Sequence, residues 1–342
     1  MVERIAMLEH GGNLRAAMAQ FARPPSEWID LSTGINPLMY PAPAVHVDAW
    51  QRLPEPSPAL LAAACRYYGA PAVLPVAGTQ AAIQALPQLR AHSRVAVVSP
   101  TYAEHAHQWR RALHDVREVS HTELDVDVDA VIDACDVLVL CNPNNPTGAR
   151  IAPECLLDWA ERLAARGGWL VVDEAFGDME PALSVAQCSD RAGLIVLRSV
   201  GKFFGLAGLR LGFVAAERSI LKSLEDEIGP WSVSGPAQQI GCAALADIGW
   251  QTAMRAQLTD AGLRLQQLLA RHAIASSGTA LFQWWPEPDA VAFRQHFAEA
   301  GIWVRLFTAG AGGIRLGLPP DEAGWQRLGD GLAGWISRQG KQ

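Results

Sequence analysis

The middle of the chain alternates short runs of apolar, mostly β-branched residues with longer Ala- and Leu-rich stretches of mixed polarity. Short apolar runs are typical of buried strands, and longer amphipathic stretches are typical of helices. The alternation predicts repeated β-α-β units around a mainly parallel sheet, and therefore an α/β fold. Strands are expected at Val95–Ser99, Val137–Cys141, Trp169–Val172, Leu194–Arg198 and Leu211–Ala215.

Four of these strands lead into a polar or glycine-bearing turn, with the sequences SPTY, NPNNPTG, DEAF and SVGK. In an open α/β sheet, ligands bind beyond the carboxyl ends of the strands. We therefore expect the four turns to meet at one site.

The two ends of the chain have different patterns from the middle. Residues 1 to about 56 are rich in Pro and Gly and predict an extended arm, which a helix from Ser57 to Tyr68 follows. One or two long helices are expected from Gly235 to His272. Short strands near 282–285, 303–307 and 314–318 and a last helix from about 321 to 337 complete the chain.

This change of pattern divides the chain into three parts. We expect an N-terminal arm that carries a substrate loop over residues 1–35, a large domain over 36–232 and a small C-terminal α/β domain over 233–342.

Composition excludes several classes of protein. The 342 residues are 50% hydrophobic and 18% charged, with a net charge of −7, so a globular core is expected and nucleic acid is a poor partner. No run of about 18 uncharged apolar residues predicts a membrane span, and the N-terminal residues lack the apolar stretch of a signal peptide. A cytoplasmic protein is expected.

Cysteine and histidine spacing predicts neither a disulfide framework nor a bound metal. The six cysteines are scattered without a C-x-x-C pair, and no set of His and carboxylate residues has the spacing of metal ligands. Reduced, mostly buried thiols are the simpler interpretation.

Three residues in the turns are candidates for chemistry. Lys202 follows a buried strand in a tight glycine-flanked turn, so it either faces the ligand crevice as a reactive amine or extends along the surface to water. Asp173 ends an apolar strand, where it could hold a pyridine nitrogen protonated or cap the next turn. Asn145 offers an amide donor, although Asn-Pro is also an ordinary turn sequence.

An anion site is expected where Gly78 and Thr79 open an apolar helix, because backbone N–H groups are free there. Ser199 and Arg210 could add a hydroxyl and a guanidinium. The alternative for Thr79 is a simple helix cap.

Taken together, these motifs resemble those of the fold-type I pyridoxal-phosphate enzymes of the class I/II aminotransferase superfamily. NPNNPTG, VVDEAF and SVGK occur in that order, and Arg210 follows Lys202 by eight residues. The resemblance implies an aspartate aminotransferase-like fold, with a three-layer αβα large domain, a smaller C-terminal domain and a homodimeric assembly. Its cofactor would be pyridoxal 5'-phosphate.

The same resemblance implies a role for each matching residue. Lys202 corresponds to the Schiff-base lysine, Asp173 to the partner of the pyridinium nitrogen and Asn145 to the donor for the ring hydroxyl. Tyr102 corresponds to the residue that stacks on the ring. The phosphate ligands would be Gly78, Thr79, Ser199 and Arg210, and Arg315 in GIRLGL would bind the substrate carboxylate.

Within that superfamily, four segments resemble the branch of threonine-phosphate decarboxylases of cobalamin biosynthesis. They are His10-Gly11-Gly12-Asn13, the LSTGINP segment with Asn36, the DEAF turn and PWSVSG. The branch implies a phosphorylated amino acid as substrate, and the HGGN turn suits a phosphate clamp because glycines let backbone N–H groups approach an anion. A flexible N-terminal loop is the alternative. Histidinol-phosphate aminotransferases are the second candidate family.

Two residues depart from the usual aminotransferase pattern. Phe176 stands where a tyrosine is common, which leaves Asn145 as the main partner of the ring hydroxyl. Leu53 stands where many relatives have a tyrosine that reaches the partner subunit's cofactor, so this contact is not expected here.

Other conspicuous residues are not selected as site residues. Trp284 and Trp285 are interpreted as packing, and His105 and His107 do not share a helix face. Arg305 could reach a phosphate, but an alternating strand explains it equally well. A non-catalytic cofactor-binding regulator would need an added DNA-binding module, for which the chain offers neither length nor basic charge.

Overall fold

The strands of the middle region form one seven-stranded sheet in the order β2-β8-β7-β6-β5-β3-β4 in the computed structural model, which describes residues 10–308 and 312–339. They are β2 (Val73–Val76), β3 (Arg94–Ser99), β4 (Asp115–Ser120), β5 (Val137–Cys141), β6 (Trp169–Asp173), β7 (Leu194–Ser199) and β8 (Gly212–Ala215). Strands β3 to β7 run parallel, whereas β8 is antiparallel to β7 and β2. The mainly parallel sheet is confirmed. β8 reverses because no crossover helix separates it from β7.

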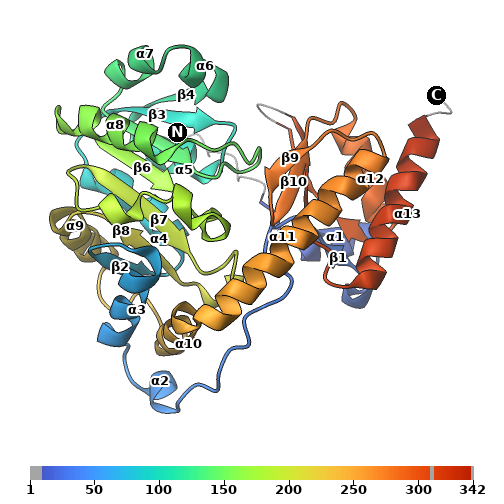
Figure 1. Ribbon diagram of the computed structural model, residues 1–342, viewed down its shortest axis with the longest axis horizontal. Coiled ribbons are helices and arrows are strands. Elements are labelled where there is room, and N and C mark those ends of the chain that lie inside the picture. The colour runs from blue at the N-terminus through green and yellow to red at the C-terminus, as the bar shows by residue number, and fades with distance from the viewer. Residues whose placement is uncertain (1–9, 309–311, 340–342) are drawn as a thin grey trace, which may run out of the picture. The chain divides into compact units, whose positions relative to one another are not determined.

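Helices cover both faces of this sheet, which confirms the three-layer α/β fold (Figure 1). On one face, Val97, Val139 and Val171 are fully buried or nearly so. They pack with Ile83, Trp109 and other side chains of three helices in one apolar cluster. The α-helices of this region of the chain are α2 (Asp48–Gln51), α3 (Pro58–Tyr68), α4 (Thr79–Ala85), α5 (Glu104–Arg111), α6 (His121–Val126), α7 (Val128–Asp133), α8 (Pro153–Ala164), α9 (Arg218–Ile228) and α10 (Gly235–Ala246).

Local sequence sets the ends of the predicted helix at 57–68. The Ser57 side chain accepts a hydrogen bond from the Leu60 backbone N–H (3.3 Å), and Pro58 occupies the first turn. Gly69 ends the helix with a φ of 68°, a conformation that favours glycine.

The chain divides into two compact units. Unit 2 is residues 38–257, and unit 1 combines the described parts of 1–37 and 258–342. The sequence pattern instead suggested boundaries after residues 35 and 232. Residues 233–257 group with the sheet because α10 packs on α3, where Gln238 accepts a hydrogen bond from the Ser57 N–H (2.8 Å).

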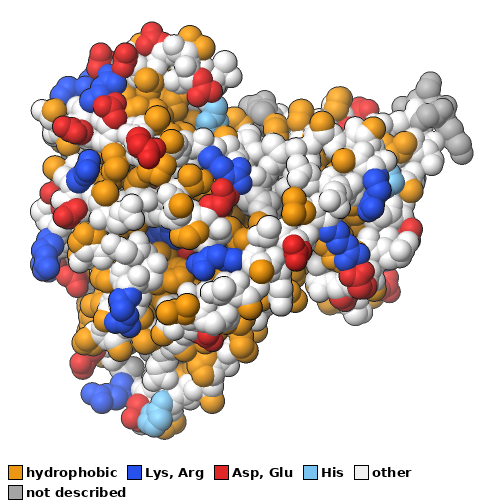
Figure 2. Space-filling model, viewed as in Figure 1, with side chains coloured by type: hydrophobic (Ala, Val, Ile, Leu, Met, Phe, Trp, Pro, Cys, Tyr) orange, Lys and Arg blue, Asp and Glu red, His pale blue; other side chains and the backbone are white. Residues whose placement is uncertain are grey.

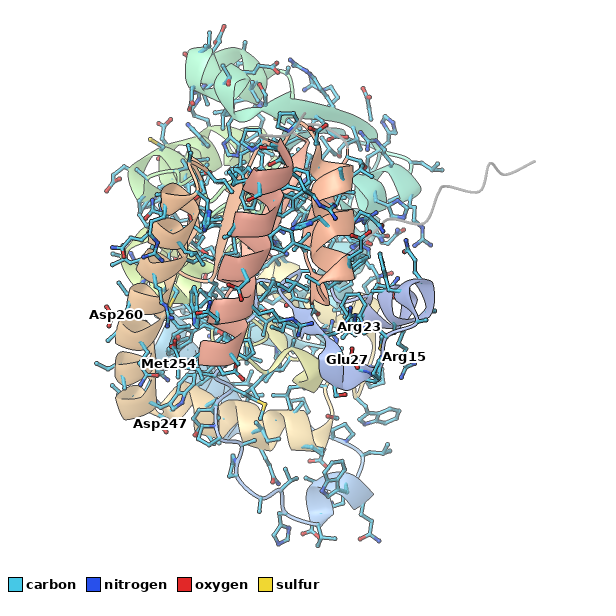
Figure 3. All side chains as sticks on the ribbon, turned by 90° about the vertical axis from the view of Figure 1, so that its right-hand side faces the viewer. Arg15, Arg23, Glu27, Asp247, Met254 and Asp260 are labelled. Carbon is cyan, nitrogen blue, oxygen red and sulfur yellow. The ribbon has the colours of Figure 1, made fainter. Side chains whose placement is uncertain are left out.

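Unit 1 contains a four-stranded antiparallel sheet in the order β12-β13-β10-β9, and a separate parallel pair joins β1 to β11. Figure 3 shows α12 and α13 side by side. Residues 1–9 of the expected arm lie outside the described residues. The elements are α1 (Leu14–Phe21), β1 (Ile29–Asp30), β9 (Ser277–Thr279), β10 (Phe282–Trp285), α12 (Ala290–Glu299), β11 (Ile302–Trp303), β12 (Arg305–Phe307), β13 (Gly313–Gly317) and α13 (Glu322–Gln339); α11 (Ile248–Arg271) spans residues of both units.

The prediction of an extended arm and connections over residues 1 to about 56 did not include the helix α1. Its residues, LRAAMAQF, are mostly strong helix formers, and the neighbouring Pro and Gly residues obscured them. Ala17 is buried against Trp28 and Ala298 in a small apolar cluster. Just beyond the helix, Arg23 pairs with Glu27 at 2.8 Å (Figure 3).

Among the described residues, no helix combines the length and the apolar character that a membrane span requires.

Candidate active site

Side chains at the carboxyl ends of three neighbouring strands share one face of the large sheet. Alternation along each strand places Cys141, Asp173 and Ser199 on the same face as the buried apolar cluster. Cys141 lies directly beside Asp173 in the register of β5 and β6, and Leu197, two residues before Ser199, lies beside Asp173 in β7. The turns after these strands carry Asn145 and Lys202, so the expected convergence of turns is present at this edge.

Asp173 is buried and hydrogen-bonded on both oxygens. Its Oδ2 lies 2.9 Å from His105 Nε2, and its Oδ1 accepts the Ala175 N–H at 3.0 Å. Burial by itself disfavours a charged His105, but hydrogen bonds with Asp173 and Cys141 outweigh this effect and raise the pKa of His105 to about 10. The imidazolium therefore compensates the buried carboxylate.

His105 is a partner of Asp173 that sequence reasoning did not select. It lies in the second position of α5 and is 2% exposed. The only local signal was a His beside the SPTY turn, and no rule of helix spacing connects it with Asp173, which is 68 residues away.

A second group of donors surrounds the start of α4. Gly78 has a φ of +72°, and a Cβ atom added there would lie 2.5 Å from Arg210 Nη2. The Arg210 guanidinium therefore lies directly over the Gly78 backbone, an approach that only glycine permits. Ser199 Oγ accepts the Gly201 N–H at 3.1 Å, which leaves its proton available to an acceptor. Thr79 is half-buried in the first turn of the helix.

Tyr102 is held by a polar chain from α4 and α5. Its hydroxyl donates to Gln80 Oε1 (3.1 Å), and Gln80 Nε2 donates to Glu104 Oε2 (2.7 Å). Burial and the nearby Glu104 carboxylate raise the pKa of Tyr102 to about 12, so the hydroxyl remains protonated at neutral pH. Its ring lies edge-on to His105, with 6.1 Å between ring centroids.

Lys202 is half-buried, and its Nζ lies 5.4 Å from the centre of the Phe176 ring. Phe176 is buried and belongs to the DEAF turn. Because the DEAF turn follows β6, the amine lies near the end of the strand that carries Asp173.

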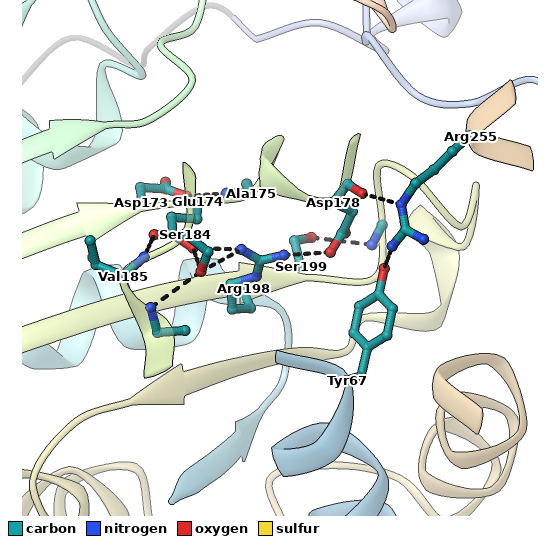
Figure 4. A network of polar contacts seen from close by, with 12 residues as sticks. Tyr67, Asp173, Glu174, Ala175, Asp178, Ser184, Val185, Arg198, Ser199 and Arg255 are labelled. Carbon is teal, nitrogen blue, oxygen red and sulfur yellow. Dashed lines mark hydrogen bonds and ion pairs between the residues drawn. The ribbon is translucent and has the colours of Figure 1, made fainter. Parts of the chain in front are cut away.

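Behind this edge lies a buried ionic network (Figure 4). Arg198 donates to Glu174 (2.5 Å) and to Asp178 (2.6 Å), and its guanidinium lies 4.6 Å from the centre of the Tyr68 ring. Arg255 donates to the Asp178 carbonyl oxygen (2.8 Å). Burial raises the pKa values of both carboxyl groups, and Arg198 opposes this rise. Glu174 follows Asp173, and Arg198 precedes Ser199, so the network fixes the strand ends that carry the site.

We expect Arg198→Met to destabilise the protein by about 3–5 kcal/mol, because two buried carboxylates would lose their main counter-ion. The midpoint of denaturant unfolding, followed by circular dichroism, measures this loss. Arg94→Met removes an exposed pair with Asp136 and should leave the midpoint almost unchanged. Equal midpoints for the two variants would contradict the assigned role of the network.

In unit 1, Ser32 joins two of the predicted substrate-binding segments. Its Oγ accepts the Gly12 N–H (2.8 Å), and its carbonyl oxygen accepts a hydrogen bond from Arg315 Nη2 (2.6 Å). A Cβ atom on Gly11 would lie 2.5 Å from that carbonyl oxygen, so Gly11 packs closely against Ser32. The turn from Gly11 to Gly12 and Arg315 are therefore brought together through Ser32.

The remaining predicted substrate residues differ in exposure. Asn36 is buried at 2% exposure, whereas His10 and Asn13 are exposed. Asn13 immediately precedes α1 without a side-chain capping bond to it. The structure thus gives Asn36 a buried position and presents the two side chains of the HGGN turn to solvent.

Arg305 is a second residue that sequence reasoning did not select. It lies directly opposite Arg315 in the antiparallel pair of β12 and β13, so both side chains share one face. Like charges in this position repel each other. Burial and the charge of Arg305 lower the pKa of Arg315 to about 9, which still leaves it protonated at neutral pH. Two adjacent guanidinium groups of this kind favour the binding of an anion.

His105, Cys141 and Asp173 also form a cluster of possible metal ligands, with ligand atoms within 4.8 Å of one another. All three are buried. Within the cluster, His105 Nε2 lies 2.9 Å from Asp173 Oδ2, and Cys141 Sγ accepts a hydrogen bond from the Thr101 hydroxyl at 3.0 Å, so these groups already have hydrogen-bond partners.

Comparisons with known proteins identify the family and the fold. The family description "Aminotransferase class I and II" matches residues 47–323. A threonine-phosphate decarboxylase from Pseudomonas aeruginosa is 52% identical over 96% of this chain and 98% of its own length, and one from Sinorhizobium sp is 44% identical over the same shares. The crystal structure of histidinol-phosphate aminotransferase from Sinorhizobium meliloti in complex with pyridoxal-5'-phosphate superposes with a TM-score of 0.83 at 19% identity, covering 99% of this chain and 97% of that one.

Proposed function

The chain belongs to the aminotransferase class I and II family, and from this premise we propose that it is a pyridoxal-phosphate-dependent lyase that decarboxylates L-threonine O-3-phosphate. The product is (R)-1-amino-2-propanol O-2-phosphate, for the aminopropanol arm of cobalamin (vitamin B12) biosynthesis. The observation that carries this assignment is 52% identity over nearly the whole length of a threonine-phosphate decarboxylase.

The residues at the sheet edge fit pyridoxal phosphate. Its phosphate is an anion, and Arg210 over the Gly78 backbone, with the Ser199 hydroxyl, supplies donors that have no carboxylate partner in the part of the chain that the structure describes. Its pyridine nitrogen needs an acidic partner. Asp173 is a buried carboxyl group, and its Oδ2 lies 2.9 Å from His105 Nε2. Its aldehyde needs an amine, which Lys202 offers.

When bound, the cofactor supplies an electron sink for the carbanion that remains at Cα after CO₂ leaves. Asp173 would hold the pyridine nitrogen protonated, and His105 would orient that carboxylate through their hydrogen bond. Asn145 would donate to the ring hydroxyl, and Tyr102 would pack against the ring. Lys202 would carry the proton to Cα.

Substrate recognition is assigned to residues of unit 1. Arg315 binds the α-carboxylate, and His10, Gly11, Gly12 and Asn13 bind the substrate phosphate together with Asn36. The carboxylate and the phosphate are both anions, so Arg305 beside Arg315 supplies a further positive charge for the substrate. These contacts orient the bond to the carboxylate, and orientation decides between decarboxylation and transamination.

The alternative function is that of a histidinol-phosphate aminotransferase, since that reaction uses the same electron sink. Incubation with L-threonine O-3-phosphate should release CO₂ and aminopropanol phosphate, with a kcat/KM at least about 10³-fold above that for histidinol phosphate with 2-oxoglutarate. Coupled CO₂ detection and chromatography of the phosphorylated amine measure the two reactions. Transamination of histidinol phosphate without turnover of threonine phosphate would reject the proposal.

We also propose a cytoplasmic homodimer. The six cysteines are all free, as expected in a reducing compartment. Large apolar side chains in and near residues 38–53 of unit 2 are exposed, including Met39 (59%), Trp50 (71%) and Leu53 (66%). Figure 2 shows orange side chains over the lower part of this unit. A second copy of the chain is the proposed partner for this surface.

A further inference from the structure

Ser32 is a fully buried serine of unit 1 whose hydroxyl, N–H and carbonyl groups all have hydrogen-bond partners. Its hydroxyl donates to Asp30 Oδ1 (2.6 Å), which also accepts the Ser32 N–H (2.8 Å). A serine hydroxyl has one proton and two lone pairs, and a carboxylate only accepts. The proton is therefore used on Asp30, and a lone pair of Oγ accepts the Gly12 N–H (2.8 Å).

The backbone just before Ser32 is hydrogen-bonded on both sides. The Leu31 N–H donates to the Trp303 carbonyl oxygen (2.8 Å), and the Leu31 carbonyl oxygen accepts the Gly317 N–H (2.7 Å). Gly317 ends β13, the strand that carries Arg315. The Ser32 carbonyl oxygen adds a bond from Arg315 Nη2 (2.6 Å). Backbone bonds therefore fix Ser32 relative to the strand of Arg315.

The turn at Gly11 and Gly12 is attached to the same serine. A Cβ atom on Gly11 would lie 2.5 Å from the Ser32 carbonyl oxygen and 3.3 Å from its Oγ, so a side chain at this position would displace Ser32. Gly12 has a φ of +81° and gives its N–H to Ser32, so it anchors the turn. One buried residue therefore sets the separation between this turn and the Arg315 guanidinium.

We propose that Ser32 is a positioning residue that determines specificity: it holds the turn at a fixed separation from Arg315 and so selects substrates whose carboxylate and phosphate have a matching separation. The inference rests on the proposed function, in which Arg315 binds the α-carboxylate and the turn binds the phosphate. L-Homoserine O-phosphate carries the same two anions as L-threonine O-3-phosphate, but one more methylene group separates them. Ser32 should therefore disfavour the longer molecule.

Three variants separate this role from that of a merely structural buried serine. Ser32→Ala removes the hydroxyl bonds to Gly12 and Asp30, whereas the backbone carbonyl that binds Arg315 remains. Ser32→Thr keeps a hydroxyl for both bonds. Ser189→Ala is the matched control, because Ser189 is equally buried and its hydroxyl has no hydrogen-bond partner in the described part of the chain. If the extra methyl group of threonine prevents folding, the two alanine variants decide.

The first measurement is hydrogen–deuterium exchange in the cofactor-loaded enzyme without substrate, followed by mass spectrometry of overlapping peptides that cover the turn. The Gly12 N–H should exchange at least about threefold faster in Ser32→Ala, because its acceptor is lost. Ser32→Thr and Ser189→Ala should exchange at the wild-type rate. This measurement does not depend on the identity of the substrate.

The second measurement uses the decarboxylation assay to compare the KM of threonine phosphate with the inhibition constant of homoserine phosphate. In the wild type the inhibition constant should exceed KM by at least about tenfold, because the longer molecule cannot place both anions on fixed partners. In Ser32→Ala, KM should rise about three- to tenfold while the inhibition constant does not rise, so their ratio falls. Ser32→Thr and Ser189→Ala should keep the wild-type ratio.

An unchanged exchange rate at Gly12 in Ser32→Ala would overturn the inference, and so would an unchanged ratio of the inhibition constant to KM. A wild-type enzyme that binds the two phosphates equally well would overturn it too. Failure of the proposed function gives a different result, because the wild type would then not turn over threonine phosphate at all.

Discussion

Lys202→Ala is expected to lower decarboxylation of threonine phosphate by at least about 10³-fold, because the variant loses both the amine that holds the cofactor aldehyde and the acid that returns a proton to Cα. Its half-buried position on the Phe176 ring supports this role. CO₂ release and the visible absorbance of the purified protein should be lost together. An unfolding midpoint close to that of the wild type would show that the loss is chemical.

Lys222→Ala is the matched control. Lys222 is an exposed lysine of α9 that pairs with Asp226, and it lies outside the proposed site. The variant should retain the wild-type rate and absorbance. Lys202→Ala with even a tenth of wild-type activity would remove the central assumption of the proposed mechanism.

Asp173→Asn has the second largest expected effect. The amide keeps the shape of the side chain but cannot hold a pyridine nitrogen protonated, so we expect kcat to fall by about 10²–10⁴-fold while KM changes little. Stopped-flow single-turnover measurements would assign the loss to the chemical step. Asp136→Asn, at an exposed ion pair beside the same sheet, should leave kcat unchanged.

The same variant has a distinct pH signature. His105 has a pKa raised from 6.5 to about 10, so the pairing of imidazolium with carboxylate contributes its full stability below about pH 6.5 and loses it as pH rises through about 10. In Asp173→Asn the carboxylate that raises the pKa of His105 is gone, whereas burial still lowers this pKa. His105 should therefore lose its proton at a lower pH than in the wild type. If the pH dependence of unfolding is the same in wild type and variant, this ion pair is not formed.

Periodicity alone predicted the parts of the fold that repeat along the chain. The buried runs at Val137–Cys141 and at 194–198 fall within observed strands, because a strand enclosed by helices must be apolar throughout. The alternation of faces then accounts for Asp173 and Ser199 at the same edge. The α1 helix was missed because a short helix among Pro and Gly residues has too few turns for a period.

Two neighbours of the proposed site could not be predicted in this way. The contact between His105 and Asp173 depends on how α5 is rotated about its axis against β6. Asp173 is 68 residues further along the chain, and no local sequence pattern encodes that rotation. The position of Arg305 beside Arg315 depends on the register between β12 and β13, which pairs the two residues. The roles of the predicted site residues themselves came from resemblance and stay predictions until the variants are measured.

The division of the chain also has a consequence for synthesis on the ribosome. Unit 2 is one continuous stretch, 38–257, whereas β1 near the N-terminus pairs with β11, some 270 residues later. Domains generally fold as they emerge, N-terminal segments first. Here α1 and β1 are synthesised before unit 2, but the strand that pairs with β1 is synthesised only when residues 302–303 have been added. Unit 1 therefore begins first and is completed last.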